Sequence, residues 1–265
     1  MFLLYFIFHK MPLLSECKNE FDEMVCFKNA MEEVTSQPMW MKSHQIERQQ
    51  WNPYSQEGGT TCAISGDNFV VVGADTRMTQ YDINIISRDA EKIHILNNKI
   101  ILATAGFYGD VLELNRVLEA RLHKFRFDYR KDMTVDLCSE LLARNLYYKR
   151  FFPFITGSVL AGIDEKGRGA VYSYDPVGCI ERTAYTASGT GEPLIMPFLD
   201  CQVGNCTKSA DGEKPQLTIE RATALVKDVF RMVAEREIGT GDKINLVIAE
   251  AGKPIKHVFL PLRED

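Results

Sequence analysis

The chain has 265 residues, of which 45% are hydrophobic and 25% charged, with a formal net charge of -5 at pH 7. These proportions are typical of a globular protein that can bury one large core. The acidic balance and the absence of any long basic run argue against a protein that binds nucleic acid.

The cysteines and the N-terminal residues indicate the cellular compartment in which the protein works. The seven cysteines form no CxxC pair and stand at no zinc-ligand spacing with histidine, which predicts reduced thiols in a cytoplasmic or nuclear protein without metal or cofactor. The apolar run from Met1 to Phe8 is far shorter than the roughly 20 residues of a bilayer span, and it lacks the flanks of a secretory signal. We therefore expect no membrane partner. The cysteines are Cys17, Cys26, Cys62, Cys138, Cys179, Cys201 and Cys206.

Residues 1 to 50 show no sustained periodicity, and prolines and tryptophans interrupt what pattern there is. They predict an N-terminal arm or pro-segment that is disordered or trimmed, followed by one domain over residues 51 to 265. From Gly59 onward, alternating apolar residues predict an antiparallel sheet. Its strands are Thr61 to Ser65, Phe69 to Ala74, Ile83 to Ser87, Ile93 to Leu96 and Lys99 to Ala105.

The hydrophobic period then changes from two to 3.6, which indicates helices. A first helix runs from Val111 to Phe125 with Asp110 as its cap, and Thr134 caps a second that ends before Phe151. Strands return at Ser158 to Ile163 and Ala170 to Tyr174. A short helix from Leu194 to Leu199, a polar loop from Asn205 to Pro215, and a helix from Thr218 through Glu237 follow. The last strands are Ile244 to Ala249 and Ile255 to Leu260.

This order of elements predicts an α+β fold, a four-layer α/β/β/α sandwich of two antiparallel sheets. Several segments carry a resemblance to the proteasome β-type subunits, in that family's order and spacing. The resemblance extends from Trp51 to Asp265 and implies the N-terminal nucleophile hydrolase fold. The segments are Asn52 to Tyr54, Gly58 to Thr60, Ala74 to Arg77, Ala105 to Asp110, Leu118 to Leu122, Arg150 to Pro153, Gly169 to Gly178 and Leu225 to Phe230.

Active members of the family use an N-terminal threonine as nucleophile and its freed amine as base. The resemblance places that threonine sixteen residues before Asp75, where this chain has Gly59. Thr60 is one residue further along the strand, so its side chain should point to the opposite face of the sheet, about 3.3 Å away. We therefore expect no catalytic residue, with an active threonine peptidase that uses Thr60 after self-cleavage as the alternative.

Other positions also match or depart from the family's site. Asp75 and Lys92 match its acid and lysine, although a turn ligand and a surface charge would explain them equally well. Glu237 stands where active members carry aspartate. Glu192 replaces a serine beside the presumed oxyanion site, where its charge would oppose catalysis.

The expected function is that of a noncatalytic structural β subunit of the proteasome core particle, in intracellular and ubiquitin-dependent protein degradation. The resemblance implies as partners the other β subunits of a seven-membered ring, the opposing β ring and the α rings. It implies no cofactor. Surfaces that face these partners, including the Asn205 to Pro215 loop, should look too exposed in the single chain. A free-standing binding module is the remaining alternative.

Overall fold

The computed structural model describes residues 54–55, 57–80, 83–97, 99–205 and 216–262. The predicted arm over residues 1 to 50 lies outside the described residues, as does the loop from residue 206 to 215.

The first sheet contains the strand that follows Gly59. Its five strands lie in the order β10-β1-β2-β11-β12, and every neighbouring pair is antiparallel. Strand β1 lies in the sheet interior with Cys62 opposite both Gly73 of β2 and Ala187 of β10. The residues at the start of β1 therefore lie between the ends of two other strands. The bounds are β1 Thr60–Ser65, β2 Phe69–Asp75, β10 Tyr185–Gly189, β11 Lys243–Glu250 and β12 Lys256–Pro261.

The second sheet has five antiparallel strands in the order β5-β6-β7-β8-β9. A separate two-stranded sheet pairs β3, Met78–Gln80, with β4, Asn84–Ser87. The strands of the second sheet are β5 Ile93–Leu96, β6 Ile100–Gly106, β7 Thr156–Ile163, β8 Gly169–Tyr174 and β9 Ile180–Thr183.

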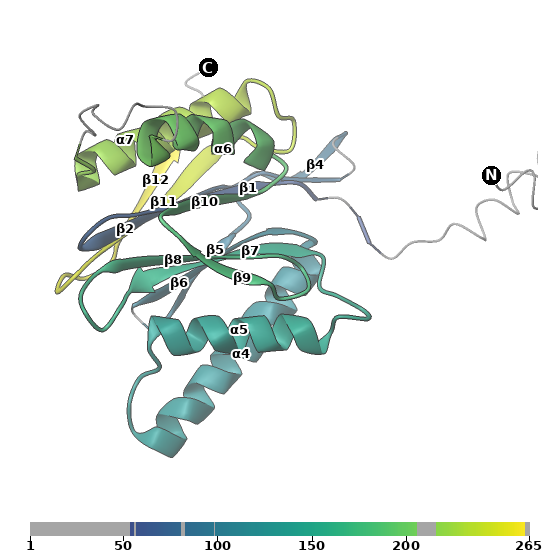
Figure 1. Cartoon of the computed structure of the whole chain (residues 1–265). Coiled ribbons are helices and arrows are strands. Elements are labelled where there is room, and N and C mark those ends of the chain that lie inside the picture. The colour runs from purple at the N-terminus through teal and green to yellow at the C-terminus, as the bar shows by residue number, and fades with distance from the viewer. Residues whose placement is uncertain (1–53, 56, 81–82, 98, 206–215, 263–265) are drawn as a thin grey trace, which may run out of the picture. The chain divides into compact units, whose positions relative to one another are not determined.

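Helices cover the outer faces of the two large sheets (Figure 1). Helices α4, Tyr108–Tyr129, and α5, Val135–Tyr148, pack on the second sheet. Helices α6, Glu192–Leu199, and α7, Ile219–Ala234, pack on the first, and α6 continues into a π-helical turn, η2, Asp200–Gly204. The four-layer α/β/β/α sandwich is thus confirmed.

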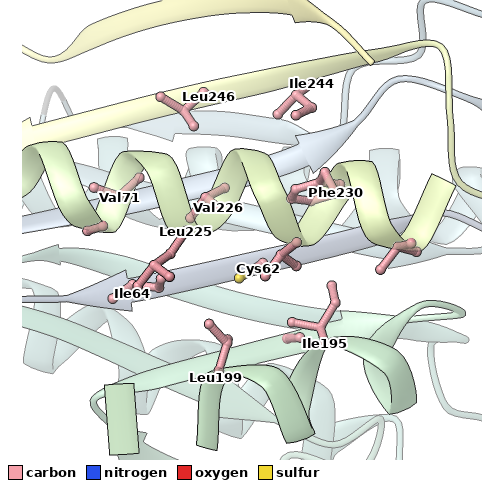
Figure 2. Close-up of a cluster of buried hydrophobic side chains, with 14 of the residues drawn as sticks. Cys62, Ile64, Val71, Ile195, Leu199, Leu225, Val226, Phe230, Ile244 and Leu246 are labelled. Atoms are coloured by element: carbon pink, nitrogen blue, oxygen red, sulfur yellow. The ribbon is translucent and has the colours of Figure 1, made fainter. Parts of the chain in front are cut away.

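Three apolar layers hold these four layers together. One lies between the sheets and includes Ala63, Val72 and Val159. Another joins α4 and α5 to the second sheet. The third joins α6 and α7 to the first sheet, and Figure 2 shows Cys62 and Ile64 of β1 facing Leu225, Val226 and Phe230 of α7, with Ile195 and Leu199 of α6. Even-numbered residues of β1 therefore face the helices, and Ala63 faces the other sheet.

The predicted N-cap residue is confirmed for two helices and is wrong for a third. The Thr134 and Thr218 side chains accept hydrogen bonds from Leu137 N and Arg221 N, as expected of N-caps. Asp110, however, is not a cap. It lies inside the first turn of α4, and its carboxylate accepts from Ile155 N at 2.9 Å, because the start of β7 passes beside it.

The remaining differences concern element boundaries. Helix α7 ends at Ala234, short of the predicted Glu237, because the following residues form a turn next to β11. Strands β3, β9 and β10 were not predicted. Their sequences are short and rich in polar or small residues, so pairing with neighbouring strands decides their conformation.

Candidate functional site

Gly59 lies immediately before β1. Its φ is +96°, and its carbonyl accepts a hydrogen bond from Thr190 N at 3.0 Å. A Cβ atom built at Gly59 would lie 2.3 Å from Nζ of Lys92, so a side chain here would point at the lysine. The position that the resemblance assigns to the nucleophile thus has the right orientation and no side chain.

Asp75 and Lys92 form a buried ion pair beside Gly59. Lys92 Nζ lies 2.7 Å from Asp75 Oδ1 and also donates to the carbonyl of Arg77. Asp75 is fully buried, and its two oxygens accept three backbone N–H groups, from Thr60 at 2.8 Å, Arg77 at 3.2 Å and Gly241 at 3.3 Å. These donors compensate the carboxylate for lost hydration. The alternative of Lys92 as a surface charge is wrong, because only 5% of this residue is exposed.

The hydroxyl of Thr60 points away from this ion pair. Its Oγ1 lies 2.6 Å from Oγ1 of Thr240 and accepts a hydrogen bond from Gly191 N at 3.0 Å. A Cβ at Gly191 would lie 2.7 Å from Val233 of α7, so this corner is on the helix-facing side of the sheet. As expected from the alternation along β1, Gly59 and Thr60 face opposite sides of the strand.

The backbone nitrogen of Thr60 is a peptide N–H that donates to Asp75. Cleavage of the chain between Gly59 and Thr60 would be needed to free this nitrogen as the base of the threonine mechanism. Thr60 is also fully buried, with no exposed surface. In this arrangement its hydroxyl joins β1 to the loop after β10 and to the turn before β11.

A pocket of about 350 Å³ opens at Gly59, lined also by Gly106, Gly189 and Thr190. The chain that precedes β1 forms part of its wall. Glu57 accepts a hydrogen bond from Tyr108 N at the start of α4, and its carbonyl accepts from Thr79 N. The residues immediately before Gly59 are thus held against the body of the domain.

The two glutamates singled out in the sequence are not among the residues that line the Gly59 pocket. Glu192 is exposed, and it lines a separate pocket of about 470 Å³ together with Cys179 and Glu181. This pocket adjoins the Gly59 pocket, because both are lined by Gly157 and Pro176. That the charge of Glu192 opposes catalysis beside the oxyanion site stays a prediction. Glu237 accepts a hydrogen bond from Gly239 N at 3.2 Å and so closes the turn that positions Thr240.

The sequence did not single out Thr240 or Gly191 as partners of Thr60. A signal for Thr240 was present, because the resemblance that covers Glu237 extends over Arg236 to Gly241, and the family carries serine or threonine at the position of Thr240. Cys62 is fully buried, and burial raises the pKa of its thiol to about 12. A neutral buried thiol is a poor nucleophile.

Across the described part of the chain, no group of three or more His, Cys, Asp and Glu side chains could hold a metal ion. None of the described helices is both long and apolar enough to cross a membrane.

Comparisons of this chain with known proteins identify its family. A family model described as "Proteasome subunit" matches residues 55–249. The chain is 68% identical over 247 residues to "Proteasome subunit beta type-1" of Caenorhabditis elegans, covering 93% of this chain and 96% of that protein. The proteins of the same name from Arabidopsis thaliana and Danio rerio are 42% and 40% identical, each over 81% of this chain and over 97% and 90% of their own lengths. The nucleophile hydrolase fold, the Asp75–Lys92 pair and these matches agree, and the chain belongs to the proteasome subunit family.

Proposed function

We propose that this chain is a noncatalytic β subunit of the proteasome core particle, whose function is to build the β ring and the wall of the proteolytic chamber. The family and the name of its relatives support its place in the particle. The partners would be the other β subunits of a seven-membered ring, the opposing β ring and the α rings. The protein would act in the cytoplasm and nucleus.

Gly59 is the observation that carries the noncatalytic part of the proposal. The acid and the lysine of the family's site are present and paired, but the side chain that they would activate is absent. The Lys92 ammonium group occupies the space into which a nucleophile would project. Without a hydroxyl or thiol at that point, the site cannot form an acyl-enzyme.

The alternative is an active threonine peptidase that uses Thr60 after self-cleavage. It requires the Thr60 hydroxyl to turn toward Lys92. The hydroxyl would then lose its hydrogen bonds with Thr240 and Gly191 on the other side of the strand. The buried Gly191 N–H would then lack an acceptor, at a cost of about 1–3 kcal/mol. The geometry therefore favours a structural function for Thr60.

Two measurements on the native particle separate these functions. Intact-mass analysis of the subunit should give an N-terminus upstream of Gly59, and an electrophilic peptide probe should leave the subunit unlabelled. A mature N-terminus at Thr60 together with covalent labelling of Thr60 would overturn the proposal. Migration of the native chain as a monomer, with no other subunits, would overturn its place in the particle.

Trimming of residues 1 to 50 would require another protease, because Gly59 cannot act as nucleophile. We propose that an active neighbouring subunit trims them in trans. A particle in which every active subunit is inhibited should then carry the untrimmed chain, and the same intact-mass measurement reads this out.

A further inference from the structure

An aromatic turn at the end of helix α5 is the most exposed apolar surface among the described residues that no packing layer of the fold uses. It comprises residues 147–152, defined here as the aromatic turn. Its exposed fractions are 59% for Tyr147, 88% for Tyr148, 95% for Phe151 and 69% for Phe152. Aromatic side chains bury about 150–250 Å² each, so these four offer roughly 600 Å². Contiguous exposed patches of this size mark interaction sites.

The aromatic turn is held in one conformation by the backbone. Lys149 N donates to Leu146 O at 3.1 Å, Arg150 N to Tyr147 O at 3.0 Å, and Phe152 N to Lys149 O at 2.9 Å. The Lys149 ammonium group of the turn lies 3.9 Å from the ring centre of the buried Phe154, which joins the turn to the packed residues of the domain. Rings presented on such a pre-ordered support lose little conformational entropy when a partner binds.

The charged side chains of the segment that contains the aromatic turn have one sign. From residue 141 to residue 163 the chain contains Arg144, Lys149 and Arg150 and no Asp or Glu. The Arg150 guanidinium lies over the rings of Tyr147 and Phe151, at 5.8 and 5.7 Å.

Two carboxylates of neighbouring segments approach this part of α5 and β7, and both already accept backbone N–H groups. Asp110 accepts from Ile155 N, and Asp175 accepts from Val177 N and Cys179 N. The cations of the aromatic turn are therefore left without a carboxylate partner among the contacts of the described residues.

We infer that the aromatic turn is a docking surface for another subunit of the particle, which offers an apolar face bordered by Asp or Glu carboxylates. Exposed Tyr, Phe and Arg side chains are typical of the residues that dominate binding energy in protein interfaces. The positive charges of Arg144, Lys149 and Arg150 require a partner surface with negative charge. Roughly 600 Å² is close to the 800 Å² that each partner buries in a standard interface. This inference rests on the proposed function and specifies which surface of the chain performs it.

A competition experiment in cells tests the inference. A tagged full-length chain is expressed beside the untagged chain, and its fraction in purified particles is measured by mass spectrometry. The double variant Tyr148→Ser/Phe151→Ser should enter particles at least tenfold less than the tagged wild-type chain, and Arg150→Glu several-fold less. Both variants alter exposed side chains, so the domain should keep its fold, which circular dichroism of the purified chain checks.

The matched control is Phe127→Ser/Tyr129→Ser. It removes two aromatic rings of 70% and 64% exposure from the C-terminal end of α4. It should enter particles as the wild-type chain does. Equal incorporation of the aromatic-turn variant and this control would overturn the inference and leave the proposed function intact. Failure of the tagged wild-type chain to enter any particle would instead overturn the proposed function.

A second measurement identifies the occupant. A photo-crosslinking amino acid at position 148 of the assembled subunit should yield cross-links to a different subunit, at peptides that contain Asp or Glu. Cross-links only to a second copy of this chain, or none in the intact particle, would overturn the inference. So would selective sedimentation of the wild-type chain, and not the Tyr148→Ser/Phe151→Ser variant, with phosphatidylserine vesicles, since a lipid surface would then be the partner.

Discussion

Restoring the absent threonine by the substitution Gly59→Thr should not create a working peptidase site. The new Cβ would lie 2.3 Å from Nζ and 2.8 Å from Cε of Lys92, whereas non-bonded heavy atoms pack at about 3.5–4.0 Å. Lys92 would have to move, and it is held by Asp75 and by the Arg77 carbonyl. Separating a buried ion pair costs about 3–5 kcal/mol.

The backbone adds a further cost. Gly59 has φ of +96°, which is strained for any residue with a Cβ, at about 1–3 kcal/mol. We therefore expect Gly59→Thr to lower incorporation of the subunit into particles and to leave the incorporated fraction inert. The reason is that the substitution displaces the lysine that a threonine nucleophile would need.

The assay is covalent labelling of purified particles that contain the tagged variant. A fluorescent electrophilic peptide is added, and the label on the variant subunit is normalised to the amount of that subunit. Gly59→Ala is the matched control, because it introduces the same Cβ and the same strain without a hydroxyl. Labelling of Gly59→Thr but not Gly59→Ala, with a new N-terminus at residue 59, would refute the reasoning.

Three further predictions follow from burial and packing. Gly73→Ala should lower the free energy of unfolding by about 1–3 kcal/mol, since its Cβ would lie 2.6 Å from a side chain of α7; an unchanged thermal midpoint would contradict this. Iodoacetamide at pH 8 should modify the exposed Cys179 and spare Cys62, whose pKa burial raises to about 12; peptide mass spectrometry reads this, and equal labelling would refute it. Burial alone would raise the pKa of Asp164, but backbone N–H groups and two arginines lower it to about 2. Its folded pKa is thus below the unfolded value of about 3.9, so it stabilises the fold above that pH. Asp164→Asn should destabilise the domain at pH 7, and denaturant titrations should show the difference shrinking from pH 4 towards pH 2.

The sequence determined the layers of the fold because these depend on local hydrophobic period. The buried face of α7 recurs at helical spacing from Ala222 to Val233, and the strands β1 and β2 alternate or run apolar on either side of a Gly-Asp-Asn turn. Such patterns specify which face of an element is buried before any partner is known. That the position matching the family's nucleophile is Gly59, which has no functional group in any conformation, was likewise visible in the sequence.

Only the tertiary structure decided what surrounds Gly59. That Lys92 is buried against Asp75, that Thr60 pairs with Thr240, and that Glu192 faces another pocket all depend on strand ends and loops that are distant in sequence. The short polar strand β10 is formed because β1 supplies its hydrogen-bonding partner. Periodicity describes how one segment is buried, whereas the contacts of a polar side chain are set by which other segments the packed sheets bring beside it.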